Sequence, residues 1–338
     1  MTTDSTTASL RALMRDLIDY AGLFPPATLD MATAVRRYEQ YRRGPAAWLL
    51  GRFIVPAGRL AELGEAASEL LDPALPLRLS VLARGGASSE EFLANIEDAM
   101  SQIADFQASH GAAVRIEMLE CPLPADILDT LNLMDDSRLF GRVADRAEPL
   151  GDAPIYFEVA PSERWAERVA LAIEAIADYN RSVGRRATGF KLRCGGTPDP
   201  AFPSAEQIAY VLDLCQAARV PLKATAGLHH PVRHFDAQSN HMRHGFFNLF
   251  GAGMLAWTHG LSMNSLVAIV QDQDATSFHF GDDRFTWKEW GVATDQLARL
   301  RREAFISYGS CSFTEPVEDL HVLGYLPAVE GTEPVVTE

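Results

Sequence analysis

Short apolar runs recur along the chain at a nearly regular interval, and this repeat restricts the fold more than any other feature of the sequence. Eight runs of about strand length follow one another roughly 25 to 40 residues apart, with helical segments between them. The runs are Leu17–Gly22, Phe53–Pro56, Leu77–Ala83, Val114–Glu120, Ile155–Ala160, the two segments around Lys191 and Lys223, and Phe246–Leu255. Eight strand–helix units predict an α/β fold of the (β/α)8 TIM-barrel type. A doubly wound open sheet is the alternative, but no GxGxxG fingerprint follows the first run.

The predicted barrel spans residues 17–271 and leaves a segment at each end. Residues 1–16 open with the polar stretch MTTDSTTAS, so we expect a flexible N-terminus there. Residues 272–338 contain the tryptophan-bearing RFTWKEW and the irregular YGSCSFTEP. We interpret this last part as a C-terminal extension that packs on the barrel.

The composition of the chain restricts the kinds of molecule that it is expected to bind. The 338 residues carry a net charge of −15 and have a pI near 5.0, which disfavours nucleic acid and anionic membrane surfaces. The N-terminus lacks a secretory signal pattern, and no apolar stretch approaches the roughly 20 residues that span a bilayer. Four cysteines without paired spacing indicate reduced thiols. We therefore expect a cytoplasmic protein of small-molecule metabolism, and the sequence leaves open whether it forms a homo-oligomer.

Lysine is rare in this chain, and its placement points to amine chemistry. Of only three lysines, two lie near the ends of the sixth and seventh runs, Lys191 in TGFKLRCGG and Lys223 in VPLKATAG. A desolvated amine can attack a carbonyl to form a Schiff base, whereas a guanidinium cannot. A second ammonium nearby lowers the pKa of the first through like-charge repulsion. The alternative is that both lysines snorkel or pair with carboxylates.

Other candidate groups fall at the same predicted end of the barrel. Catalytic carboxylates would come from Asp19, Glu117 and Glu158, because strand ends on the C-terminal face carry the chemistry of such barrels. Arg193 and Arg233 could bind an anionic group of the substrate or pair with one of these carboxylates. His229 and His230 could line the pocket and transfer protons.

Several of these segments together resemble the deoxyribose-phosphate aldolases, a family of class I, Schiff-base-forming (β/α)8 enzymes. The opening LIDYAGLFPPATLDMATAV is similar to that family's first strand, proline-containing loop and helix. The resemblance implies that Lys191 is the Schiff-base lysine and Lys223 the second lysine of the seventh strand. Glu117 corresponds most nearly to the family's proton-relay aspartate. FGAGM is similar to the eighth-strand phosphate loop, which implies that Gly251 and Gly253 bind substrate.

The sequence departs from this family in ways that concern the substrate. Leu192, Arg193 and Cys194 replace the hydroxyl residues that follow the Schiff-base lysine, and Leu228 stands at the second glycine of the seventh-strand motif. Backbone cradles for phosphate depend on such glycines. The resemblance therefore implies a carbon–carbon lyase that needs no added cofactor and acts on a small carbonyl compound, with the substrate left unnamed.

Two further interpretations remain open at this stage. Five of the nine histidines fall within residues 229–244, and His230 and His234 have the i, i+4 spacing of metal ligands on a helix. The cluster could hold a divalent transition metal in a metal-dependent hydrolase or lyase. The chain could also be a non-catalytic barrel that binds a ligand.

Overall fold

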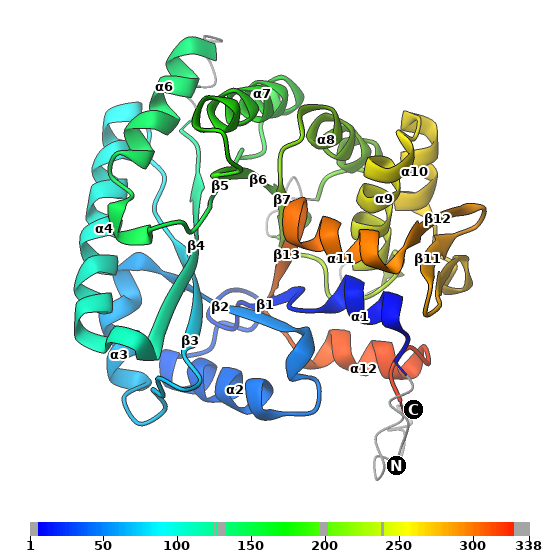
Figure 1. Ribbon diagram of the computed structural model, residues 1–338, viewed down its shortest axis with the longest axis horizontal. Coiled ribbons are helices and arrows are strands. Elements are labelled where there is room, and N and C mark those ends of the chain that lie inside the picture. The colour runs from blue at the N-terminus through cyan, green and yellow to red at the C-terminus, as the bar shows by residue number, and fades with distance from the viewer. Residues whose placement is uncertain (1–5, 125, 128–132, 197–201, 238–239, 328–338) are drawn as a thin grey trace.

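The computed structural model describes residues 6–124, 126–127, 133–196, 202–237 and 240–327. Within them, eight parallel strands close into a barrel in the order β1-β13-β7-β6-β5-β4-β3-β2 (Figure 1). The strands are β1 (Ile18–Tyr20), β2 (Leu50–Pro56), β3 (Leu77–Leu82), β4 (Val114–Pro122), β5 (Ile155–Glu158), β6 (Thr188–Arg193), β7 (Leu222–Thr225) and β13 (Phe305–Ser310). The predicted (β/α)8 barrel is confirmed.

Helices surround the barrel and cover its apolar exterior (Figure 1). They are α1 (Ala8–Met14), α2 (Met31–Arg43), α3 (Leu60–Ala66), α4 (Ser89–His110), α6 (Leu133–Ala144), α7 (Trp165–Val183), α8 (Ala205–Ala218), α9 (Phe246–His259), α10 (Met263–Gln271), α11 (Thr294–Glu303) and α12 (Thr314–Val322). Polar side chains fix several starts: Asp30 accepts a hydrogen bond from the Thr33 N–H, and Ser204 with Gln207 forms a capping box. These caps set where each helix leaves the end of its strand.

The eighth strand lies elsewhere than the sequence predicts. The run Phe246–Leu255 belongs to helix α9, which is buried on all sides between α8, α10 and β12 (Trp290–Ala293), so its apolar residues show no one-sided pattern. The strand that closes the barrel is β13, which falls in the segment expected to be an extension. The barrel therefore runs from β1 to β13, and the predicted boundary at residue 271 is wrong.

Two small antiparallel sheets and helix α1 lie outside the barrel strands in the described part of the chain. An antiparallel sheet of β10 (Phe278–Phe280), β11 (Arg284–Trp287) and β12 precedes α11, and a hairpin of β8 (His234–Asp236) and β9 (His241–Arg243) follows β7. Helix α1 packs against α11 with Leu10, Leu13 and Met14 buried, so the predicted flexibility of residues 1–16 is wrong for residues 8–14. Among the described residues, no helix combines the length and apolar character needed to cross a bilayer.

Candidate active site

The interior of the barrel holds a continuous polar network to which every strand contributes. One charged or hydroxyl side chain from each strand contacts another member of the set, and all but Arg52 belong to residues buried to more than nine-tenths. In order of strands β1 to β7 and then β13, the members are Asp19, Arg52, Ser80, Glu120, Glu158, Lys191, Lys223 and Ser307. Such a cluster of buried, mutually paired ionisable groups is typical of an active site.

The two lysines stand side by side, and one carboxylate joins them. Lys191 on β6 and Lys223 on β7 are in register across neighbouring parallel strands. Glu120 on β4 bridges them, with Oε2 2.8 Å from Lys191 Nζ and Oε1 3.2 Å from Lys223 Nζ. The Ser80 hydroxyl donates to the same Oε1. The sequence singled out both lysines but left open whether they lie close together, and it did not identify the carboxylate between them.

Lys191 lies between two carboxylates. Its Nζ is 2.8 Å from Glu120 Oε2 and 3.0 Å from Glu158 Oε2. Burial by itself lowers the pKa of this ammonium, but the two carboxylates outweigh burial and raise the pKa above its usual value. The sequence-based expectation that Lys223 lowers the pKa of Lys191 is therefore wrong for the resting state. The amine can become nucleophilic by passing a proton to one of the adjacent carboxylates.

Lys223 is held more deeply than Lys191. Its ammonium pairs with Asp19 and lies 3.2 Å from Ser307 Oγ, and that hydroxyl donates to Asp19 Oδ2 at 2.6 Å. Burial raises the pKa of Asp19, but Lys223 and Arg52 outweigh it and lower the pKa to about 2. The Lys223 side chain is 0% exposed, against 8% for Lys191. Lys191 is therefore the lysine closer to solvent.

Glu117 pairs with arginines and not with either lysine, and it reaches the network through Arg52, so the predicted role for it is corrected. Its carboxylate accepts hydrogen bonds from Arg78 at 2.9 and 3.1 Å and lies 3.1 Å from Arg52 Nε. It sits at an irregularity in the pairing of β3 and β4, near the N-terminal end of its strand. Glu120 is nearer the C-terminal end of β4, where barrel enzymes carry their chemistry. That rule, applied to VRIEMLECP, would have selected Glu120.

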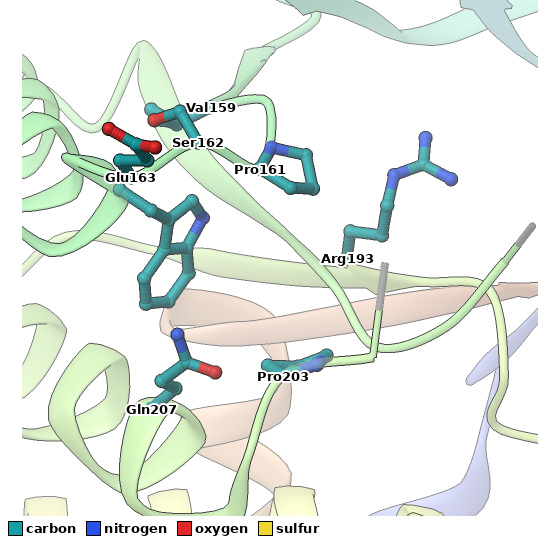
Figure 2. Close-up of a pocket in the computed structure, with 8 residues that line it drawn as sticks. Val159, Pro161, Ser162, Glu163, Arg193, Pro203 and Gln207 are labelled. Atoms are coloured by element: carbon teal, nitrogen blue, oxygen red, sulfur yellow. The ribbon is translucent and has the colours of Figure 1, made fainter. Parts of the chain in front are cut away.

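A cavity lies at the C-terminal ends of β5 and β6. It has a volume of about 290 Å³ and is lined by Val159, Pro161, Ser162, Glu163, Trp165, Arg193, Pro203 and Gln207. Figure 2 shows the Arg193 side chain extended beside Pro161, across from Glu163. Arg193 Nε contacts Glu158 Oε1 at 2.6 Å, and the other oxygen of Glu158 contacts Lys191. Glu158 thus connects the cavity to the amine.

The remaining predicted residues lie outside the lysine network. Arg233 Nη1 lies 2.9 Å from Nδ1 of the buried His244, whose pKa burial lowers to about 4. The expected loop at Gly251 and Gly253 is part of α9, so it does not form an anion-binding turn. A Cβ at Gly253 would meet the Phe305 ring at 2.3 Å, which shows that the glycine permits close packing of helix on strand.

The histidines after β7 contact helix α12. His229 pairs with Glu315 and His230 with Asp319. The His230 and His234 rings are in edge contact, 4.2 Å apart at their centroids, and His234 lies in β8 instead of a helix. Over the part of the chain that the structure describes, no three His, Cys, Asp or Glu side chains are grouped to hold a metal ion. The geometry therefore gives no support to the metal-dependent alternative.

Comparison with known proteins gives only remote similarity. Neither a scan against models of protein families nor a search of curated proteins finds a match. Among solved structures, one described as "QR15, an Aldolase" has 12% sequence identity and a TM-score of 0.44, covering 64% of this chain and 83% of its own. Two structures of a Toxoplasma gondii ME49 protein, provisionally described as a deoxyribose-phosphate aldolase, have 10% identity and TM-scores of 0.48 and 0.47. They cover 94% of this chain and 95% and 97% of their own. These similarities are too low to assign a family.

Proposed function

We propose that this protein is a carbon–carbon lyase of the class I aldolase type, in which Lys191 forms a Schiff base with a small carbonyl substrate. The observation that supports this best is the placement of Lys191 between Glu120 and Glu158, with Lys223 in register beside it. A primary amine in contact with proton acceptors is what carbinolamine formation and dehydration require.

The reaction begins when Lys191 passes a proton to Glu120 and attacks the substrate carbonyl carbon. The C=O π bond opens, the oxygen takes a proton, and loss of water leaves a protonated imine. Glu120 then takes the proton of the hydroxyl group β to the imine, and carbon–carbon cleavage moves the electron pair of the broken bond into this imine, giving an enamine and releasing an aldehyde. Protonation of the enamine carbon and hydrolysis regenerate the amine. Glu120 is the proposed proton carrier, because it contacts both lysines.

In this proposal, the cavity beside β5 and β6 binds the substrate and orients it. Arg193 lines it with a side chain that is 37% exposed, so the guanidinium can meet an anionic group while its Nε stays on Glu158. The volume of about 290 Å³ suits a small metabolite. A cytoplasmic location remains part of the proposal, and it is supported by four cysteines that all lie in the described residues and are all free thiols.

Reductive trapping tests the proposal. The protein is incubated with a panel of small aldehydes and keto acids, reduced with borohydride, and mapped by mass spectrometry. We expect an adduct on Lys191 that is absent in Lys191→Met and weaker in Lys223→Met. Lys288, with a side chain that is 53% exposed, is the internal control for nonspecific reaction. Adducts spread over Lys288 and the N-terminus, or no adduct at all, would contradict the proposal.

A further inference from the structure

A cysteine, a histidine and a glutamate form a second reactive arrangement at the mouth of the barrel. Cys311 Sγ lies 3.6 Å from His229 Nε2, and His229 Nδ1 lies 2.6 Å from Glu315 Oε2. A nucleophile in contact with a base whose other nitrogen is held by a carboxylate has the geometry of a catalytic triad. His229 lies 82 positions from Cys311 and 86 from Glu315 along the chain, so the fold and not the local sequence brings it to them.

The barrel topology explains why these residues meet. His229 follows β7 by four residues and Cys311 directly follows β13, and these strands are neighbours in the barrel. Both residues therefore lie beyond the C-terminal ends of their strands, the face that carries the chemistry in barrels of this type. Glu315 comes from α12, the helix that begins three residues after Cys311. The proposed lyase reaction uses none of the three.

Cys311 differs from the other cysteines in its surroundings. Cys121, Cys194 and Cys215 are buried, and burial raises the pKa of each thiol, which keeps them unreactive. Cys311 is partly exposed. Burial lowers the pKa of His229, but Cys311 and Glu315 outweigh it and raise the pKa to about 9. An imidazolium thus lies beside the Cys311 sulfur at neutral pH, 3.6 Å from it.

We propose that Cys311 is a second nucleophile of the barrel mouth, which adds reversibly to the carbonyl carbon of an aldehyde with His229 as the proton donor and Glu315 as the positioning carboxylate. The aldehyde is the one part that rests on the proposed function, because a lyase of that type releases or accepts aldehydes at this face. Acyl transfer to Cys311 would require a leaving group on the substrate and a water molecule that hydrolyses the acyl-enzyme. Reversible addition to an aldehyde requires neither, so the aldehyde is the simpler ligand.

The addition balances without a further reagent. In the reactive form of the pair, the shared proton is on His229 Nε2 and the lone pair of the Cys311 sulfur forms a C–S bond to the carbonyl carbon. The C=O π electrons move to the oxygen, which takes the proton from Nε2 and becomes the hydroxyl of a thiohemiacetal, leaving His229 neutral. Reversal returns the aldehyde and the thiol. The charged or titratable groups around this pair are Glu315 on α12, the neighbouring His230 with Asp319, and Tyr20 on β1, whose pKa is in part raised by Cys311.

Alkylation kinetics test the nucleophile. Iodoacetamide is applied to the native protein at pH 7, and each cysteine is followed by peptide mapping. An ordinary thiol is only about 3% ionised at that pH, so an ion-paired Cys311 should react about ten times faster than a free thiol. His229→Gln should remove this excess, and Glu315→Gln should remove part of it. Glu315 is 52% exposed, so its variant remains informative if His229→Gln does not fold. An unchanged Cys311 rate in both folded variants would overturn the proposal.

Protection by an aldehyde tests the ligand. Propanal is titrated into the Lys191→Met variant, which cannot form the proposed Schiff base, and the alkylation rate of Cys311 is measured. We expect a saturable slowing that acetone, a weaker electrophile of similar size, does not produce. Slowing that requires Lys191, or no slowing, would overturn the addition step. Borohydride trapping on Lys191 in the wild-type protein reports on the lyase proposal separately, so failure of one proposal is distinguishable from failure of the other.

Discussion

Glu120 Oε2 lies 2.8 Å from Lys191 Nζ, and in the proposed reaction this contact controls when the amine can act. The carboxylate favours the ammonium, and the pKa of Lys191 is raised because this favourable interaction, shared with Glu158, outweighs burial. The same carboxylate is the nearest acceptor for the proton that the amine must lose. One residue therefore both suppresses the free amine and provides its route of activation.

Replacing Glu120 should separate these two effects. In Glu120→Gln, the loss of one carboxylate lowers the pKa of Lys191. The pH at which reductive trapping becomes efficient should therefore be lower in this variant than in the wild-type protein. Carbon–carbon cleavage should slow by about 10²–10⁴-fold, because the proton carrier is lost. The matched control is Glu117→Gln, three residues away, which should alter neither. Trapping and cleavage that are equal in the two variants would contradict the assignment of Glu120.

The pair formed by Lys223 and Asp19 should contribute strongly to the stability of the folded protein. Lys223→Met leaves the fully buried Asp19 without its ammonium, and removal of one partner from a buried ion pair costs about 3–5 kcal/mol. The double variant Lys223→Met/Asp19→Asn should recover part of this loss, because no charge is then left unpaired at that position. Urea unfolding gives both values. A double variant as unstable as the sum of its single variants would show that the two residues act independently.

The stability of the protein should fall as pH rises past neutrality, through His229. The folded pKa is about 9, against an ordinary value of 6.5. A raised folded pKa gives a stabilisation that is fully present below pH 6.5 and is lost as pH rises toward 9. The slope of the unfolding free energy contributed by this one proton is at most about 1.4 kcal/mol per pH unit. Urea midpoints at several pH values measure it, and His229→Gln should flatten the slope over this window.

Close packing of α9 on β13 predicts a marked effect of one methyl group. Gly253→Ala places a Cβ 2.3 Å from the Phe305 ring, and overpacking of this kind costs about 1–3 kcal/mol. Gly141→Ala in helix α6 is the control, because a Cβ there meets nothing within 4 Å. That change should stabilise the helix by roughly 0.5–1 kcal/mol. Equal thermal unfolding midpoints for the two variants would contradict the packing argument.

The sequence predicted the parts of the site that local patterns report. Strand-length apolar runs located seven of the strands, and the rarity of lysine singled out Lys191 and Lys223. The eighth strand escaped detection because β13 reads FISYGS, with little apolar character, whereas α9 is apolar all round. Glu120 was missed because the family resemblance pointed to Glu117, although Glu120 lies nearer the C-terminal end of the strand. Its role depends on contacts with β6 and β7, which only the closed barrel provides.

The position of β13 in the barrel has a consequence for synthesis of the chain. β13 pairs with β1 on one side and β7 on the other, so the first seven strands emerge from the ribosome as an open sheet with two unpaired edges. Such edges are sites of intermolecular pairing. The barrel can close only after β13, which ends at Ser310, has been synthesised. Closure also brings Ser307 to Asp19 and Lys223. A nascent or truncated chain that stops before β13 therefore has neither a closed barrel nor a complete site, and its open strand edges favour aggregation.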